Sequence, residues 1–256
     1  MTTVPGPGRK SSAMPTTMMT APMAATHNRR NSCIVFNKAH PPSDSTGGTL
    51  LSPGGFWEGG IQSGDMEGAV SFEAVMGLIT ARRTNLRIDP ERPVGPALIG
   101  RLCRAATLAP NHRVTEPWRF AVLTGSARAA LGEIAAHQLA TRGVTDPARV
   151  DKARGKYPRA PVVVAAGCET DADPIRHAED RDAVAAGVQN LLLAASAAGL
   201  ATYWATGATA RSPETARVCG FEGGTVIVAL IYLGWPTAPA PSGHRSALAI
   251  TWAGGT

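Results

Sequence analysis

Two short segments constrain this chain more than any other part of its sequence. Residues 80–84 read Thr-Ala-Arg-Arg-Thr and end an apolar helical pattern. Residues 109–120 read Ala-Pro-Asn-His-Arg-Val-Thr-Glu-Pro-Trp-Arg-Phe and lead from the end of a helix into a strand. Each segment is common by itself. The two segments in this order, about 30 residues apart, form a much rarer combination.

The hydrophobic spacing around these segments predicts two helices. One begins after Ser71, a candidate N-cap, and ends at Arg82-Arg83. The other begins near Pro96 and stops before Pro110. One face of this second helix is apolar, with Leu98, Ile99, Leu102, Cys103 and Ala106.

Further along the chain, helical and strand patterns alternate. Helices are expected over 126–142, 180–198 and 212–219, and strands over 119–124, 161–168, 201–206 and 225–233. This order predicts one α+β domain over residues 71–256, with an α/β mixed sheet flanked by helices. No Gly-x-Gly-x-x-Gly follows a strand, so the dinucleotide-binding fingerprint is absent from the sequence.

Residues 1–70 are rich in Pro, Gly, Ser, Thr and Met and show no sustained periodicity. We expect a low-complexity extension that is mostly disordered. Because Met66 lies just before the first helix, the extension could also be an artefact of an upstream start codon. A third interpretation is an arm that wraps a partner, anchored by Phe56 and Trp57.

Composition excludes several classes of protein. The formal net charge of +6 comes without a run of like charges, whereas a nucleic-acid-binding stripe would show one. The four cysteines are widely spaced, which argues against a zinc site or a disulfide framework and predicts a reducing cytoplasm. No apolar run approaches the length of a membrane helix. The run after Arg29-Arg30 is too short and polar for a secretion signal.

The motifs resemble those of the nitroreductase superfamily over residues 71–235. Arg82-Arg83-Thr84 is similar to the family's Arg-Arg-Ser, and Ala-Pro-Asn-His at 109–112 to the second motif of a short, single-domain branch. Three further stretches match in order and spacing, at 152–161, 203–207 and 230–236.

The resemblance implies a nitroreductase-like fold, with FMN bound at the interface of a homodimer. It assigns FMN contacts to Arg82, Arg83 and Thr84, with a guanidinium on the phosphate or on the N1/O2 edge of the flavin and a hydroxyl donor from Thr84. The alternative is that Arg82 and Arg83 are cations that complement the dipole at a helix C-terminus.

The resemblance also places four more residues at the flavin. His112 would lie near the flavin, contributed by the neighbouring subunit, although a lone loop histidine is usually just solvated. The backbone of Trp204, Ala205 and Thr206 would lie against the flavin, where an N–H aimed at N5 supports hydride arrival. Trp204 could equally be a strand tryptophan that fills the core.

Two departures from the family pattern affect the phosphate site. Thr84 replaces the usual Ser and keeps the hydroxyl, and Leu108 stands where the family often has a basic residue. Phosphate binding then depends more on the arginine pair, on Arg87 or on a distal group, for which Arg245 is a weak candidate.

The function that this implies is that of an FMN-dependent oxidoreductase. NAD(P)H would pass a hydride to the flavin, and a nitroaromatic, quinone or other small electrophile would then take it in ping-pong order. No obligatory proton donor is needed, so no catalytic side chain is predicted, nor is a metal. The alternatives are a flavin-binding sensor or storage protein without turnover, and a basic nucleic-acid-binding module.

Overall fold

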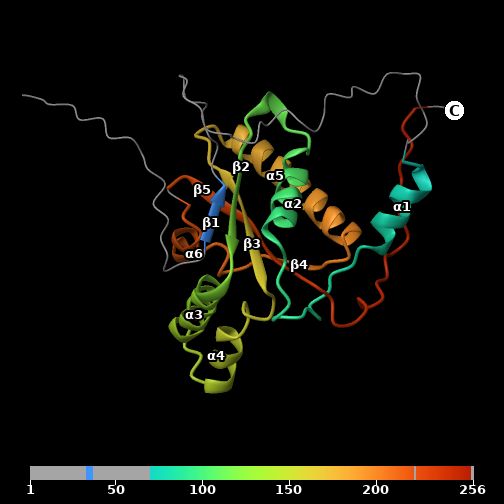
Figure 1. Ribbon diagram of the computed structural model, residues 1–256. Helices are drawn as coiled ribbons and strands as arrows, with labels where there is room; N and C mark the ends of the chain where they lie inside the picture. Colours follow the sequence, from blue (N-terminus) through green and yellow to red (C-terminus); the bar gives the residue numbers. More distant parts are fainter. Residues whose placement is uncertain (1–32, 37–69, 222, 255–256) are drawn as a thin grey trace, which may run out of the picture.

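The computed structural model describes residues 33–36, 70–221 and 223–254. Its helices are α1 (Phe72–Ala81), α2 (Pro96–Thr107), α3 (Gly125–Thr141), α4 (Pro147–Arg154), α5 (Pro174–Ala197) and α6 (Pro213–Val218), with a 3-10 turn, η1 (His112–Val114). Its strands are β1 (Cys33–Phe36), β2 (Trp118–Leu123), β3 (Val162–Glu169), β4 (Ala201–Ala205) and β5 (Thr225–Gly234) (Figure 1).

The strands form one sheet in the order β1-β2-β3-β5-β4, and each neighbouring pair is antiparallel. Strand β4 therefore lies at one edge. A register shift between Ala166 and Gly167 interrupts the β3–β5 ladder. The predicted α+β class, with helices flanking a sheet, is confirmed. The ladders between the strands are all antiparallel. The isolated bridge between Thr84 and Thr202 is parallel.

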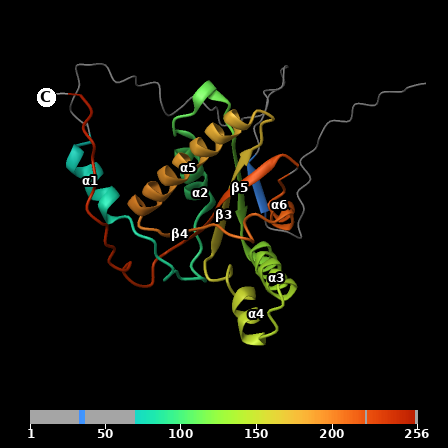
Figure 2. The same ribbon diagram turned by 180° about the vertical axis from the view of Figure 1, so that it is seen from behind.

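Side chains that alternate along the strands build two cores, one on each face of the sheet. Val162 and Val164 of β3 join the core beneath α2 and α5. Val163 and Ala165 join the opposite core, which α3 and α6 cover. Figures 1 and 2 show the resulting layers from front and back, with α5 crossing the molecule along one face.

Several predicted helix boundaries are confirmed by their caps. Ser71 accepts a hydrogen bond from the Ala74 N–H at the start of α1, and Ser212 accepts one from Thr215 at the start of α6. The predicted start of the long helix at Asp180 is wrong. Helix α5 begins at Pro174 because Asp173 caps it and proline at the first position fits a helix N-terminus.

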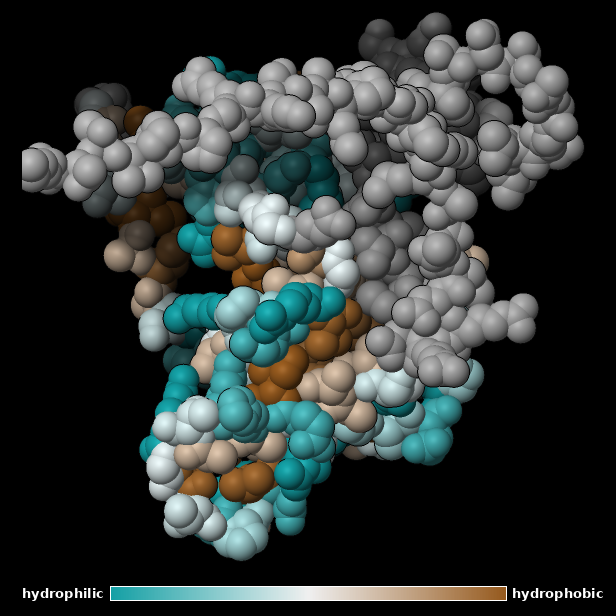
Figure 3. All heavy atoms as spheres, turned by 90° about the vertical axis from the view of Figure 1, so that its left-hand side faces the viewer, coloured by the Kyte–Doolittle hydropathy of each residue, from teal (hydrophilic) through white to brown (hydrophobic). Residues whose placement is uncertain are grey.

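Helix α4 is absent from the sequence prediction. No residue of α4 is buried, so it lacks the apolar stripe from which a helix is recognised. The sequence feature that could have predicted α4 is Asp146 followed by Pro147, because Asp146 caps the helix and Pro147 takes its first position. Among the described residues on the face shown in Figure 3, hydrophilic residues surround patches of apolar ones.

Helix α1 was predicted, but none of its side chains is buried. Its apolar stripe is exposed instead, with exposed fractions of 72% for Phe72, 43% for Val75, 39% for Met76 and 42% for Ile79. Helix α1 lies at one side of the molecule, next to the C-terminal tail (Figures 1 and 2). An apolar helix face of this kind normally has a partner.

Strand β1 comes from the predicted N-terminal extension. Its backbone pairs with β2 from Cys33 opposite Leu123 to Phe36 opposite Phe120. Phe56, Trp57 and Met66 lie outside the described residues. The boundary of the extension near residue 70, and its role, stay predictions.

Among the described residues, no helix is both long and apolar enough to cross a bilayer. The same residues contain no group of three or more His, Cys, Asp or Glu side chains suited to hold a metal ion. Cys103, Cys168 and Cys219 are buried free thiols. Burial raises the pKa of the Cys103 thiol to about 12, so this group stays protonated at neutral pH.

Candidate functional site

The segment that follows α1 runs beside the edge strand β4. Thr84 forms a parallel bridge with Thr202, and the backbone N–H of Asn85 donates to the Thr202 carbonyl at 2.9 Å. This pairing fixes residues 82–84 next to the strand that carries Trp204. Six of the seven predicted site residues thus belong to two neighbouring backbone segments.

The two arginines differ in their surroundings. Arg83 donates from Nη1 to the carbonyls of Thr80 and Arg82, so it already complements the C-terminus of α1 as the alternative interpretation expects. Arg82 is half-buried, and its Nε is a buried donor with no hydrogen-bond partner. No ion pair within the described residues involves either guanidinium. Among the residues that the structure describes, no anion therefore pairs with Arg82.

Trp204 also carries an unpaired donor. Its ring packs against the core beneath α2 and α5, as the core-filling alternative predicts, yet its Nε1 is buried without a partner. Ala205 is buried and Thr206 is exposed. Gly207 follows with a φ of 137°, a conformation that side chains other than glycine rarely adopt, so the chain turns sharply out of β4 here.

A cavity of about 220 Å³ opens beside this turn. Ala205 and Thr206 line it together with the end of α3 and the segment after α4. Gln138 joins its walls, since it donates to the Ala208 carbonyl at 3.3 Å and accepts from the Thr209 hydroxyl at 3.1 Å. The wall contacts hold the turn after β4 against α3.

Two cations face this cavity, Lys156 and Arg142, and neither forms an ion pair within the described part of the chain. Burial lowers the pKa of the Lys156 ammonium, and the nearby positive charge of Arg159 lowers it further. The stretch from 152 to 161 resembles the family pattern, but its sequence predicts no role for Lys156. Its position was unpredictable because it depends on how α3 and the turn after β4 come together.

A second cavity, of about 460 Å³, lies at the other end of β4. Arg83, Asn85 and Ala201 line it, together with the end of α5 and the tail at 236–240. The buried Asn85 amide donates to the Ala238 carbonyl at 3.0 Å and thereby ties the tail to this segment. From Ala201 to Ala205 the strand spans about 13 Å, so the two cavities are a short strand apart.

His112 lies elsewhere. It belongs to η1 and its Nδ1 is 2.9 Å from Oε2 of Glu179, near the start of α5. Helix α5 ends at Ala197, next to strand β4 and the residues that pair with this strand. The 18 residue steps from Glu179 to Ala197 span about 27 Å of helix. One chain therefore does not bring His112 and the arginine segment into one site.

Three positions outside the arginine pair bear on the predicted phosphate site, namely Leu108, where the family often has a basic residue, and the two other arginines, Arg87 and Arg245. Leu108 is 63% exposed. Arg87 reaches the Pro239 carbonyl at 3.4 Å from an exposed position. Arg245 donates to the carbonyl of the preceding His244 at 3.2 Å. Among these, Arg87 lies nearest in sequence to the arginine pair.

The sequence of residues 79–235 matches the model of the Nitroreductase family. This chain is a member of the nitroreductase family. One curated relative in the family is the protein of Escherichia coli K12 provisionally named NAD(P)H nitroreductase YdjA. It is 32% identical over 165 residues, which cover 64% of this chain and 88% of the relative.

Solved structures with the nitroreductase fold superpose on this chain. A nitroreductase-like family protein from Bacillus cereus has a TM-score of 0.59 at 23% identity and covers 72% of this chain and 98% of its own. A nitroreductase with bound FMN from Bacteroides fragilis has a TM-score of 0.56 at 21% identity, with coverages of 70% and 97%. These likenesses confirm the predicted nitroreductase-like fold, and the family is one of oxidoreductases.

Proposed function

We propose that this nitroreductase-family chain is an FMN-dependent oxidoreductase that uses NAD(P)H to reduce a small electrophile such as a nitroaromatic or a quinone in ping-pong order. The observation that carries the proposal is the pairing of Thr84 with Thr202, because it joins the Arg82–Thr84 segment to the strand that leads into Trp204–Thr206. The names of the relatives and the FMN in a solved structure of the same fold support it.

The residues present fit FMN. Arg82 has a buried donor without a partner, and a phosphate oxygen is the acceptor that suits a guanidinium best. The exposed hydroxyl of Thr84 adds a further donor from the neighbouring residue. Arg83 would contribute mainly charge, because its Nη1 already donates to two carbonyls.

At the other end of β4, the chain offers a place for the flavin ring. The main chain of Ala205 and Thr206 lines the smaller cavity, and Lys156 and Arg142 bring positive charge to it. When bound, FMN supplies the hydride chemistry, while the protein contributes binding, orientation and electrostatics. Two cations beside the ring, without ion-pair partners among the described residues, would stabilise the negative charge that a flavin edge gains on reduction.

We infer that the working unit is a homodimer. His112 lies about 27 Å along α5 from the arginine segment, and the apolar stripe of α1 is exposed. A second copy that packs its α5 in the opposite direction would cover this stripe and bring its own His112 towards Arg82. The site residues would then come from both subunits.

Steady-state kinetics tests the proposed reaction. The purified protein should oxidise NAD(P)H in the presence of a quinone or a nitroaromatic, and double-reciprocal plots at several acceptor concentrations should be parallel. Intersecting lines would contradict the ping-pong order. A protein that retains FMN but oxidises no NAD(P)H with any acceptor would be a flavin-binding sensor or storage protein instead.

A further inference from the structure

The loop that carries His112 has an unusual backbone. Arg113, Val114 and Glu116 have φ values of 62°, 50° and 50°, in the left-handed region that side chains other than glycine rarely occupy. Val114 is β-branched, and for such residues this conformation is especially unfavourable. Its side chain is 75% exposed, so burial of Val114 does not compensate. Other contacts must therefore hold this loop in place.

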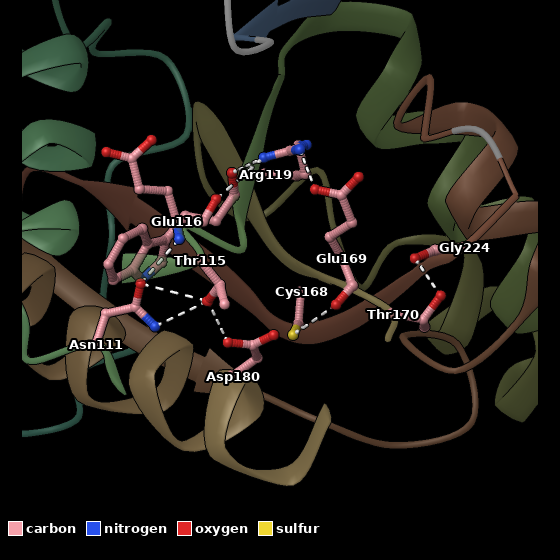
Figure 4. A network of polar contacts seen from close by, with 10 residues as sticks. Asn111, Thr115, Glu116, Arg119, Cys168, Glu169, Thr170, Asp180 and Gly224 are labelled. Atoms are coloured by element: carbon pink, nitrogen blue, oxygen red, sulfur yellow. Dashed lines mark hydrogen bonds and ion pairs between the residues drawn. The ribbon is translucent and has the colours of Figure 1, made fainter. Parts of the chain in front are cut away.

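A network of polar side chains supplies those contacts (Figure 4). The Asn111 amide donates to the Thr115 hydroxyl at 3.0 Å, and its carbonyl oxygen accepts from the Glu116 N–H at 2.8 Å. The Thr115 hydroxyl donates to Oδ1 of Asp180. Asp180 is 4% exposed and belongs to α5, so a buried carboxylate on a long helix anchors the strained loop.

The residue before this anchor contacts the histidine. The Glu179 carboxylate lies 2.9 Å from Nδ1 of His112, while the imidazole remains 61% exposed. A carboxylate only accepts hydrogen bonds, so the neutral ring must carry its proton on Nδ1. Nε2 is then the free nitrogen. Two consecutive residues of α5 thus act on one loop, Asp180 through the Thr115 hydroxyl and Glu179 through the His112 imidazole.

We propose that Glu179 and Asp180 are positioning residues that hold the 111–116 loop and fix His112 as the Nδ1–H tautomer, so that Nε2 faces the ligand in the flavin site of a second copy of this chain. The proposal rests on the FMN-dependent function and the dimer proposed above. It adds two residues to which neither the family motifs nor the relatives' names assign a role.

The tautomer matters for the acceptor. Reduction of a quinone oxygen uses a proton in addition to the hydride. A protonated His112 can give that proton from Nε2, whereupon the N–H bond breaks and the O–H bond forms. The ring is left neutral with its other proton on Nδ1, which still donates a hydrogen bond to Glu179. The exposed ring can then regain a proton from solvent.

Nitrogen NMR reads the tautomer without turnover. Full-length protein with ¹⁵N-labelled histidine is compared with His112→Gln, whose missing signals assign this ring. When its ring is neutral, His112 should show a protonated Nδ1 and a bare Nε2. Glu179→Ala should shift the tautomer ratio towards Nε2–H by about fivefold, as expected for loss of one modest hydrogen bond.

Glu133→Ala is the matched control. Glu133 is an exposed carboxylate on α3, and its ion-pair partner is Arg154 on α4. It should leave the His112 signals unchanged. A wild-type ring in the Nε2–H form, or a ratio that Glu179→Ala leaves unaltered, would overturn the proposal. If the protein binds no FMN, the proposed function fails, but the tautomer in the flavin-free chain still tests the Glu179 contact.

The Asp180 anchor is tested through Thr115. Thr115→Val removes the hydroxyl at nearly constant volume and should lower kcat/KM for a quinone about tenfold. Flavin content and the rate of reduction by NAD(P)H should stay within about twofold, because Thr115 lies outside the flavin-binding segments. Thr115→Ser should restore kcat/KM. Equal losses in both half-reactions, or no rescue by serine, would mean that the network has only a structural role.

Discussion

The two ends of α5 present the candidate site residues in opposite ways. At its end, the Arg82–Thr84 segment is held by backbone pairing with Thr202, while side-chain donors of Arg82 and Trp204 have no partner. Near its start, the loop with His112 has a strained backbone, and side chains of α5 satisfy it. We interpret the unpaired donors as partners for a ligand and the satisfied network as a means of holding one group in a single orientation.

The largest effect is expected from removing both arginines. Arg82→Ala with Arg83→Ala should abolish FMN retention, because no other described guanidinium of this segment has an unpaired buried donor. Circular dichroism should still show a folded protein. The matched control is Arg101→Ala with Arg104→Ala on the exposed face of α2. Unchanged flavin content in the Arg82 and Arg83 variant would refute the assignment of the phosphate site.

A charge on α1 should separate the two subunits of the proposed homodimer. Ile79→Glu would bury a carboxylate twice in a symmetric interface, at a cost of several kcal/mol. Light scattering after size-exclusion chromatography should show a monomer that no longer oxidises NAD(P)H. Ala148→Glu on the exposed surface of α4 is the control and should remain a dimer. If Ile79→Glu also stays dimeric, the α1 stripe is not the interface.

The rigid spacing between the two ends depends on the packing of α5 against α2. A Cβ at Gly187 would lie 2.5 Å from the Ala106 carbonyl oxygen and 2.9 Å from Trp118 Nε1. Gly187→Ala should therefore lower the free energy of unfolding by about 1–3 kcal/mol. At Gly100 of α2 a Cβ meets nothing within 4 Å, and Gly100→Ala should stabilise by about 0.5–1 kcal/mol. Denaturant unfolding of both variants measures the difference, and equal effects would contradict the packing.

The smallest effect concerns Lys156 in the cavity beside β4. Because burial and Arg159 lower the pKa of Lys156, its charged form is less favourable in the folded state than in the unfolded one. This cost is fully present below the lowered pKa and vanishes as pH rises through the ordinary value of 10.5. Lys156→Met should therefore slightly raise the Tm of the flavin-free protein at neutral pH, with the gain fading towards that value.

The same substitution should weaken FMN binding, which titration with free FMN would measure. A Tm gain that persists above the ordinary lysine pKa would mean that better apolar packing, rather than loss of the charge, is its cause. Unchanged FMN affinity would place Lys156 outside the flavin site. Together these results separate the electrostatic role of Lys156 from its contribution to the fold.

Local sequence was enough for most of the elements, although it missed α4 and misplaced the start of α5. Ser71 and Ser212 marked helix starts because capping depends on near neighbours. The separation of His112 from Arg82 was beyond prediction, since it depends on the direction and length of α5. Likewise, the spacing of Phe72 and Ile79 predicted a helix but not that its apolar stripe would be exposed.

The cofactor of the purified wild-type protein tests the central claim most directly. The visible spectrum should be that of a flavin, and acid should release FMN, identified by mass spectrometry, at about one molecule per chain, as expected for one site of Arg82–Thr84 and Trp204–Thr206 in each subunit. A colourless protein that also fails to take up added FMN would contradict the account, and so would one that releases a different flavin.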